Sequence, residues 1–254
     1  MPISPGKKIY FLSDFHLGAP DYESSLVREK KIVKFLDSIE ADAAEIFIVG
    51  DIFDFWYEYR KVVPKGYTRL LGKLASLTDK GIPIHFFVGN HDMWMSGYFE
   101  QELNISVYFE PKTFERGDKK FYIGHGDGLG PGDQGYKFIK KVFRNPFCQW
   151  LFGQIHPTWG IGLANYFSRK SRAKTGKTDE HFLGEDKEWL IIYCKEILQK
   201  EHFDYFIFGH RHLPIDCKLN DSSRYINLGD WINHFTYAVF DGNDLELKKW
   251  EIPA

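Results

Sequence analysis

The sequence predicts an α/β fold in which helices pack against sheets whose strands are buried on both faces. Short runs of almost purely apolar residues recur along the 254 residues, a pattern typical of such strands. Helix-like stretches separate several of these runs, which indicates a layered α/β architecture. A glycine or a tight loop with Asp, Asn or His follows most runs at once, and loops in that position form the active site in such folds.

The expected elements alternate along the chain. A helix is predicted over about 24–40, where apolar residues recur on one face, and another over about 68–80, where Gly81 ends it. The expected strands are the apolar runs 9–13, 46–49, 82–88, 121–123 and 203–208, with further strands at 224–228, 236–240 and 245–250.

Bulk properties limit the function classes. A chain of 254 residues with 43% hydrophobic content fits one large domain, or one domain with an inserted cap. A net charge of -2 argues against general nucleic-acid binding, which needs a strongly basic face. The cysteines Cys148, Cys194 and Cys217 are odd in number and widely spaced, so neither a disulfide framework nor a zinc ribbon is expected, and a reducing compartment fits better.

The location of the protein is also an expectation from the sequence. Residues 1–8 lack the long apolar core of a signal peptide. No uncharged apolar run approaches the roughly 18 residues that a membrane-spanning helix needs. We therefore expect a cytoplasmic protein, either free or peripheral on the inner face of the cytoplasmic membrane.

The segment 128–202 departs from the strand-and-loop pattern. It begins with a glycine-rich stretch and continues as a bulky, aromatic, helix-like run from Tyr136 to Phe167. We expect a helical cap over 128–202, inserted into a single domain that spans 1–254. The aromatic run is followed by a basic run made of Arg169, Lys170, Arg172, Lys174 and Lys177.

Five short motifs carry Asp, Asn or His directly after expected strands. A single residue of this kind is most often a helix cap or a satisfied core group. Five such sites, each after an apolar strand, are hard to assign to capping. The motifs are Asp14-x-His16, Gly50-Asp51-x-x-Asp54, Gly89-Asn90-His91-Asp92, Gly124-His125-Gly126-Asp127 and Gly209-His210-x-His212.

The donors in these motifs predict a centre with two metal ions. They are oxygens and nitrogens without thiolate, which suits manganese, iron or zinc better than a structural cysteine site does. They exceed the need of one ion, whereas two ions about 3.5–4 Å apart that share one carboxylate use them all. Such a pair activates a water and neutralises a phosphoryl group under attack, which predicts hydrolysis of a phosphate ester or anhydride. The candidate ligands are Asp14, His16, Asp51, Asn90, His125, His210 and His212.

In their order along the chain, the motifs resemble those of the calcineurin-like metallophosphoesterases. The match runs from Asp14 to His212, most of the chain. The resemblance implies a four-layer α/β/β/α sandwich and two divalent ions, with manganese expected and iron or zinc as alternatives. It also implies that His91 is a catalytic histidine that contacts phosphate oxygens.

The same resemblance implies how the ligands divide. Asp51 would bridge the two ions, so Asp51 and His91 are the expected catalytic residues. The first ion would be held by Asp14, His16, Asp51 and His212, and the second by Asp51, Asn90, His125 and His210.

Within the family, the chain resembles the UDP-2,3-diacylglucosamine hydrolases of lipid A biosynthesis. The similarity lies in the length, in the aromatic and basic insertion, and in Asp133-Gln134-Gly135-Tyr136, which is similar to the subfamily's Asp-x-Gly-Tyr. It implies cleavage of a pyrophosphate to UMP and a diacylglucosamine 1-phosphate at a membrane surface, with no obligate protein partner. The aromatic run would accept acyl chains. The expected substrate-binding residues are Asp133, Tyr136, Arg169, Lys170, Arg172, Lys174 and Lys177.

Two alternatives stay open at this point. The best-known members of the subfamily carry Arg where this chain has His91, so a related phosphoesterase for another nucleotide, phospholipid or phosphoprotein would look similar. The aromatic run would then be the insertion's own small core, and the basic run a solvated face. The other alternative is a non-catalytic, metal-binding scaffold that keeps the fold and binds a protein partner. An insertion that lies over the metals with an apolar groove favours the lipid substrate, and one that packs closed favours another.

Overall fold

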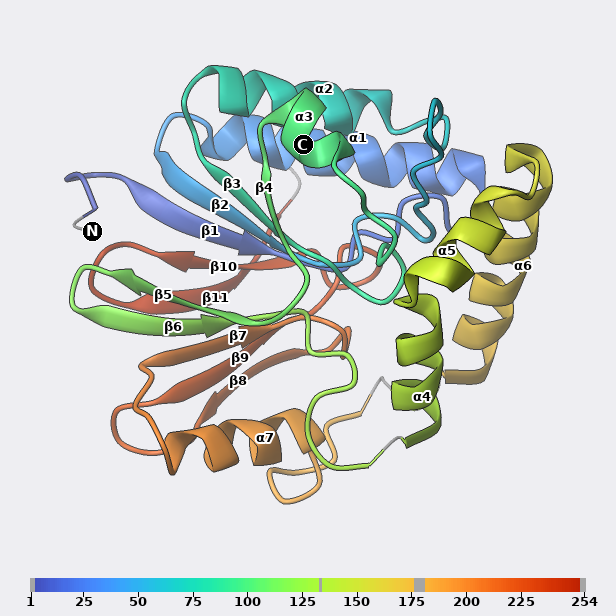
Figure 1. The fold of residues 1–254 in the computed structure, drawn as a ribbon. Helices are drawn as coiled ribbons and strands as arrows, with labels where there is room; N and C mark the ends of the chain where they lie inside the picture. The colour runs from blue at the N-terminus through green and yellow to red at the C-terminus, as the bar shows by residue number, and fades with distance from the viewer. Residues whose placement is uncertain (1–2, 133, 176–180, 252–254) are drawn as a thin grey trace.

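Two sheets face each other in this computed structural model, with helices on both outer sides (Figure 1). The structure describes residues 3–132, 134–175 and 181–251, and within 169–175 it describes the backbone alone. The order of the layers is helices, six-stranded sheet, five-stranded sheet, helix. The predicted four-layer α/β/β/α sandwich is therefore confirmed.

The six-stranded sheet contains the first strands of the chain. Its order is β11-β10-β1-β2-β3-β4. The strands β1, β2, β3 and β4 run parallel to one another, and β10 is antiparallel to both of its neighbours, β1 and β11. The bounds are Lys8–Leu12 for β1, Ala43–Val49 for β2, Ile84–Phe87 for β3, Ser106–Tyr108 for β4, Thr236–Phe240 for β10 and Leu245–Lys249 for β11.

The five-stranded sheet is mixed. Its order is β5-β6-β7-β9-β8, in which β6, β7 and β9 are parallel and the two edge strands are antiparallel to their neighbours. The bounds are Lys112–Arg116 for β5, Lys119–Ile123 for β6, Tyr205–Phe208 for β7, Pro214–Lys218 for β8 and Arg224–Leu228 for β9.

The alternation of side chains along β1 explains why the sheet is covered on both faces. Tyr10 and Leu12 pack in the cluster shared with the outer helices, whereas Ile9 and Phe11 pack in the cluster between the two sheets. Successive side chains of a strand point to opposite faces, so a continuous apolar run fills two interfaces at once. The ring of Phe11 stacks on that of Phe121 from β6, with centroids 6.0 Å apart, and this contact joins the sheets.

The outer helices cover the two sheets. Helices α1 (Tyr22–Ile39), α2 (Thr68–Asp79) and α3 (Tyr98–Leu103) pack on the six-stranded sheet, and α7 (Trp189–Leu198) packs on the five-stranded one. The Asp21 side chain caps α1 by accepting from the backbone N–H of Ser24 at 2.8 Å.

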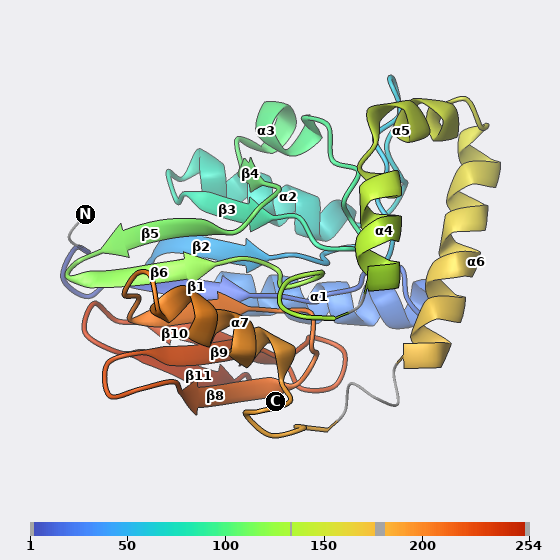
Figure 2. The same ribbon diagram turned by 60° about the horizontal axis from the view of Figure 1, so that its bottom comes forward.

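Three further helices stand beside the layers, at the side toward which β1 and β2 run (Figure 2). They are α4 (Gln134–Phe143), α5 (Pro146–Gly153) and α6 (Pro157–Thr175), and we call them the α4–α6 segment. The predicted insertion 128–202 also includes α7, but Leu190, Ile191 and Cys194 bury one face of α7 against the sheet. The exposed part of the insertion is therefore the α4–α6 segment.

The structure also holds elements that the sequence did not predict. These are α3, β4, β5 and β8, and the three strands lie at sheet edges. Cys148, Cys194 and Cys217 are free thiols, which confirms that no disulfide joins them.

Candidate metal centre

The topology brings the five motifs to one end of the sandwich. Asp14, Asp51 and Asn90 follow β1, β2 and β3, which are neighbouring parallel strands and so end at the same edge. His125 and His210 follow β6 and β7, neighbouring parallel strands of the other sheet. His16 and His212 lie in the same loops as Asp14 and His210. All seven candidate ligands are therefore carried by loops at strand ends.

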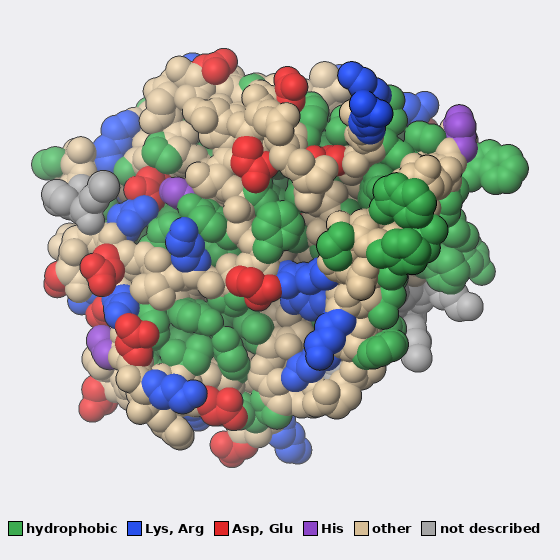
Figure 3. Space-filling model, in the orientation of Figure 1, with side chains coloured by type: hydrophobic (Ala, Val, Ile, Leu, Met, Phe, Trp, Pro, Cys, Tyr) green, Lys and Arg blue, Asp and Glu red, His purple; other side chains and the backbone are tan. Residues whose placement is uncertain are grey.

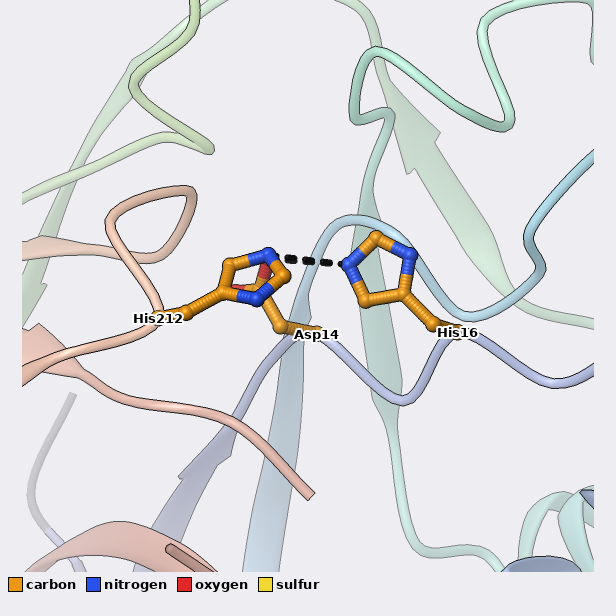
Figure 4. A group of neighbouring side chains, drawn as sticks. All are labelled: Asp14, His16 and His212. Atoms are coloured by element: carbon orange, nitrogen blue, oxygen red, sulfur yellow. Dashed lines mark hydrogen bonds and ion pairs between the residues drawn. The ribbon is translucent and has the colours of Figure 1, made fainter. Parts of the chain in front are cut away.

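One group of side chains gathers around Asp14 (Figure 4). The Nε2 atoms of His16 and His212 are 3.0 Å apart, and Asp14 Oδ1 lies 3.1 Å from His212 Nε2 and 3.6 Å from His16 Nε2. Asp51 Oδ2 lies 3.7 Å from His16 Nε2 and joins this group at its edge.

A second group gathers around Asn90. Its Oδ1 lies 2.8 Å from His210 Nδ1 and 3.1 Å from His125 Nε2. Asp51 Oδ2 lies 3.3 Å from His125 Nε2, so the same carboxylate oxygen touches both groups. The other oxygen, Asp51 Oδ1, accepts from the backbone N–H of His91 at 2.8 Å, which fixes the orientation of the carboxylate.

The backbone at the candidate ligands is in an unusual conformation. Left-handed φ angles are uncommon for residues with a side chain, and they persist only where the surrounding structure holds them. Many of the non-glycine residues with positive φ in the described chain are candidate ligands, which indicates that side-chain placement takes precedence over backbone preference here. They are Asp14 (φ 56), His16 (φ 44), Asp51 (φ 54), His210 (φ 68) and His212 (φ 51).

Two motif glycines allow these loops to approach one another. A Cβ at Gly89 would lie 2.2 Å from Asp51 Oδ1, and a Cβ at Gly209 would lie 2.5 Å from Asp14 Oδ2. Neither distance leaves room for an atom. The glycines that precede Asn90 and His210 are thus required by close packing against carboxylates of other loops.

The charges of the groups compensate one another. Burial disfavours the imidazolium of His16, but the carboxylates of Asp14 and Asp54, whose oxygens lie 3.6 Å and 3.7 Å from its ring nitrogens, outweigh burial and raise its pKa to about 9. Burial likewise opposes protonation of His125, but the charge of Asp51 and a hydrogen bond to it raise the pKa of His125 to about 10. The neighbouring histidines in turn hold the pKa of Asp14 and of Asp51 well below the usual range, against the effect of burial.

These groups fit a divalent cation. Asp14 Oδ1 is buried and accepts no hydrogen bond, and its nearest polar neighbours are the ring nitrogens of His16 and His212. A buried carboxylate oxygen without a hydrogen-bond donor has nothing to offset the cost of its burial, and a bound cation would do so. Carboxylate, carboxamide and imidazole donors without thiolate suit manganese, iron or zinc.

His91 lies beside the first group. Its ring meets that of His16 edge to face at 4.8 Å between centroids, and burial lowers its pKa. Its Nδ1 lies 2.9 Å from the carbonyl oxygen of Asp54 and 3.1 Å from Ser168 Oγ on α6. His91 is thus held between the loop that follows β2 and the α4–α6 segment.

Asp92, which was not among the predicted site residues, joins two of the ligand loops. Its carboxylate accepts from the backbone N–H of Ile52 at 2.8 Å and of Gly89 at 2.7 Å. Burial and the nearby charge of Asp51 raise its pKa to about 7. Its position at the end of the motif Gly89-Asn90-His91-Asp92 could have indicated this role, because a buried acid there needs hydrogen-bond donors from neighbouring loops.

The predicted substrate-binding residues are placed only in part. The Tyr136 hydroxyl donates to Asp127 Oδ2 at 2.6 Å, and Lys140, which the sequence did not single out, pairs with the same oxygen at 2.7 Å. Asp133 and Lys177 lie outside the described residues. Four residues lie on α6 with side chains outside the described part, namely Arg169, Lys170, Arg172 and Lys174.

A sequence profile of the calcineurin-like phosphoesterases matches residues 7–214. The chain belongs to the calcineurin-like phosphoesterase family. The matched range contains both groups of candidate ligands and His91.

Similar proteins share one name. A protein of Porphyromonas gingivalis named UDP-2,3-diacylglucosamine hydrolase is 41% identical over 256 residues, covering 96% of this chain and 98% of the relative. Proteins of the same name from Shewanella sp. and Histophilus somni are 26% and 27% identical and cover 94% and 89% of this chain. Membership of the family and this likeness along the whole chain make the protein a metal-dependent phosphoric ester or anhydride hydrolase.

Proposed function

We propose that the protein cleaves the pyrophosphate of UDP-2,3-diacylglucosamine to UMP and 2,3-diacylglucosamine 1-phosphate. The observation that carries the proposal is the pair of donor groups that share Asp51 Oδ2, in a chain 41% identical over its length to a protein with that substrate in its name. The donor groups supply the chemistry, and the likeness supplies the substrate.

The proposed centre holds two divalent ions, for which manganese is expected and iron or zinc are alternatives. Asp51 would be the shared ligand, because one of its oxygens lies within 3.7 Å of nitrogens from both groups. Bound there, the ions would supply an activated water and offset phosphoryl charge. Asp14, His16, Asp51 and His212 would hold the first ion, and Asp51, Asn90, His125 and His210 the second.

His91 is proposed to contact the phosphoryl group. Its Nδ1 donates to the Asp54 carbonyl oxygen and lies near Ser168 Oγ, which leaves Nε2 to face the phosphoryl group, where it donates to a phosphate oxygen when the ring is protonated. A ring held at one nitrogen keeps the other in a fixed direction, which is what a positioned donor or acid requires.

The α4–α6 segment is proposed to hold the diacylglucosamine part of the substrate, as the cap of a single domain. No residue of α4 or α5 is buried, although both helices are rich in aromatic and aliphatic side chains. Hydrophobic side chains gather over this segment at the right of Figure 3, with Lys and Arg side chains beside them. Ser168 places the end of this apolar surface next to His91, where acyl chains would reach from a bound pyrophosphate.

The basic residues that follow the apolar surface are proposed to bind the diphosphate. Arg and Lys side chains form charge-assisted hydrogen bonds to phosphate oxygens. The residues are Arg169, Lys170, Arg172, Lys174 and Lys177, and Asp133 and Tyr136 are proposed as further contacts to the sugar phosphate.

The same apolar surface is proposed to rest on the cytoplasmic face of a membrane, from which the lipid substrate would enter. None of the helices in the described part of the chain is long and apolar enough to cross a bilayer. Trp159 and Phe138 are 76% and 68% exposed, and exposed apolar patches of this kind mark lipid or protein contacts. No nucleic acid and no obligate protein partner belong to the proposal.

The test is incubation of the protein with UDP-2,3-diacylglucosamine and Mn²⁺, followed by chromatography of the products. UMP and 2,3-diacylglucosamine 1-phosphate are expected in equal amounts. Hydrolysis of a simple phosphodiester without release of UMP would leave the metal centre in place and transfer the proposal to another nucleotide, phospholipid or phosphoprotein. Inactivity on every phosphoester at saturating Mn²⁺ would instead support a non-catalytic metal-binding scaffold.

A further inference from the structure

A buried ion pair includes the residue that stands between two of the proposed metal ligands in the sequence. Arg211 stands between His210 and His212 in the chain and is 4% exposed, and Glu188 is fully buried. Arg211 Nε donates to Glu188 Oε2 at 3.1 Å, and the terminal guanidinium nitrogen donates to Oε1 at 3.0 Å. Two parallel bonds between planar groups fix orientation as well as distance.

The carboxylate of Glu188 serves this contact rather than its helix. Glu188 occupies the N-cap position of α7, but its side chain makes no capping hydrogen bond. Its Oε1 instead accepts from Arg211 and from the backbone N–H of Leu183 at 3.1 Å. Arg211 also donates to the carbonyl oxygen of His181 at 3.1 Å. The pair therefore joins the His210–His212 loop to residues 181–188, which return from the α4–α6 segment to α7.

The loop that carries the two histidines needs such a restraint. Both His210 and His212 have left-handed φ angles, at 68° and 51°. The loop is held at one side by Asn227, which donates to the Gly209 carbonyl oxygen, and by Asp14 Oδ2, which accepts from the His210 N–H at 3.1 Å. Arg211 supplies a further restraint, because it bonds to Glu188 at the N-terminus of α7.

Stability is a weak explanation for this pair. Desolvation of two buried charges offsets most of their attraction, so apolar residues of similar size would stabilise the fold about as well. Residues that orient metal ligands, by contrast, commonly set metal affinity, and replacing a hydrogen-bonded partner of a ligand typically weakens binding roughly 10–100-fold.

We infer that the Arg211–Glu188 ion pair is a positioning device that aims His210 and His212 at the two metal positions and thereby sets the affinity of the centre for divalent cations. The inference rests on the proposed function, because it takes His210 and His212 as ligands. It adds Arg211 and Glu188, neither of which is a predicted site residue. It also links the geometry of the centre to the segment that returns from α4–α6.

Calorimetric titration of the metal-stripped, full-length protein with Mn²⁺ tests the inference. Glu188→Gln is expected to weaken binding roughly 10–100-fold, and Arg211→Lys is expected to weaken it as well, because lysine keeps the charge but not the two-pronged contact. A matched control is Glu45→Gln, which breaks the two-pronged Arg116–Glu45 pair near the start of β2, away from the Asp51 end of that strand. Its Mn²⁺ affinity should stay within about threefold of wild type.

Melting of the metal-free variants separates positioning from a merely structural role. If Glu188→Gln and Arg211→Lys both bind Mn²⁺ with wild-type affinity, the inference is overturned, whatever their melting temperatures. If Glu188→Gln does not fold, the double variant Arg211→Met with Glu188→Leu leaves no lone buried charge, and the same loss of affinity is expected from it. Failure of the wild-type protein to bind Mn²⁺ would instead defeat the proposed centre itself.

Discussion

The metal centre and the α4–α6 segment differ in the surroundings of their side chains: those of the centre are buried against other protein groups, and those of the segment are largely exposed. The centre takes its residues from five loops far apart in the sequence, and Asp14, His16, Asp51 and His125 are at most 3% exposed. Each side chain there meets another protein group. The α4–α6 segment is continuous in sequence, and many of its large apolar side chains are exposed.

The segment is nevertheless fixed to the sandwich along one side. Phe152 on α5 packs against the rings of Tyr57 and Trp94, with centroids 4.9 Å and 4.7 Å away. Tyr57 donates to the Gln149 carbonyl oxygen at 2.7 Å, and Trp94 to that of Phe143 at 2.7 Å. A surface that is anchored on one side and apolar on the other is suited to an apolar ligand. We therefore propose that the metal centre carries out the chemistry and that the α4–α6 segment selects the substrate.

The largest effect is expected at the shared carboxylate. Asp51→Ala removes the oxygen that touches both donor groups, so turnover should fall at least roughly 10³-fold, beyond the 10–100-fold typical of residues behind the ligands. Steady-state kinetics on UDP-2,3-diacylglucosamine and on a simple phosphodiester should show the same loss. Asp118→Ala, at a side chain that is 81% exposed, is the control. Activity of Asp51→Ala within tenfold of wild type would refute its role as the bridge.

A smaller and selective effect is expected on the apolar surface. Trp150→Ser with Trp159→Ser removes two rings that are 58% and 76% exposed, and should lower kcat/KM for the diacylated substrate and binding to anionic vesicles by roughly tenfold, as expected if about 1.4 kcal/mol of apolar contact is lost. Hydrolysis of the simple phosphodiester should not change.

The matched control for that pair lies on α1. Tyr22→Ser with Val27→Ser also removes two exposed apolar side chains, at 72% and 55% exposure, and should leave vesicle binding and both activities intact. Equal losses for both pairs, or equal losses on both substrates, would mean that the α4–α6 segment does not select the substrate.

A third prediction concerns the contact between the two regions. Ser168→Ala removes the hydroxyl 3.1 Å from His91 Nδ1, so kcat should fall roughly 3–10-fold, the value of one hydrogen bond. Because the contact acts on His91, the loss should be equal for the lipid and for the simple phosphodiester, with KM little changed. Ser38→Ala, which removes a hydroxyl bonded only within α1 to Phe35, is the control. A loss confined to the lipid would indicate that Ser168 contacts substrate instead.

The smallest effect is a pH dependence of stability. The pKa values of His16 and His125 rise on folding to about 9 and about 10, so their protonation stabilises the metal-free protein below about pH 6.5, and that contribution is lost as the pH rises through those values. Metal binding requires deprotonated imidazoles, so it is also favoured as the pH rises. The rise in melting temperature caused by Mn²⁺ should therefore grow by several degrees, on the order of 3–8 °C, from pH 6 to pH 8.5. An increment that is constant with pH would show that these histidines are not displaced by the metal.

Much of the fold could be predicted because its interior strands are apolar on both faces. Ile46-Phe47-Ile48-Val49 fills two clusters at once, and such a run is visible in the sequence. β4, β5 and β8 were not predicted because they are edge strands with few buried side chains. Phe114 is the buried residue of β5, and Ile215 that of β8.

The predictability of the site follows the same division. The seven candidate ligands were recognisable because each follows a strand, and parallel strands deliver their ends to one edge. Ser168, Glu188 and Arg211 were not, because their importance comes from contacts with residues 77, 23 and 23 positions away. No local pattern reports such a contact. The substrate-binding role of Tyr136, whose hydroxyl meets Asp127, stays a prediction.

The central claim is that one oxygen of Asp51 joins two metal positions. Anomalous diffraction from crystals of the protein grown with Mn²⁺ tests it directly. Two manganese peaks are expected about 3.5–4 Å apart, with Asp51 between them and the ligand groups of Asp14 and Asn90 on either side. A single peak, or two peaks that do not share Asp51, would contradict it.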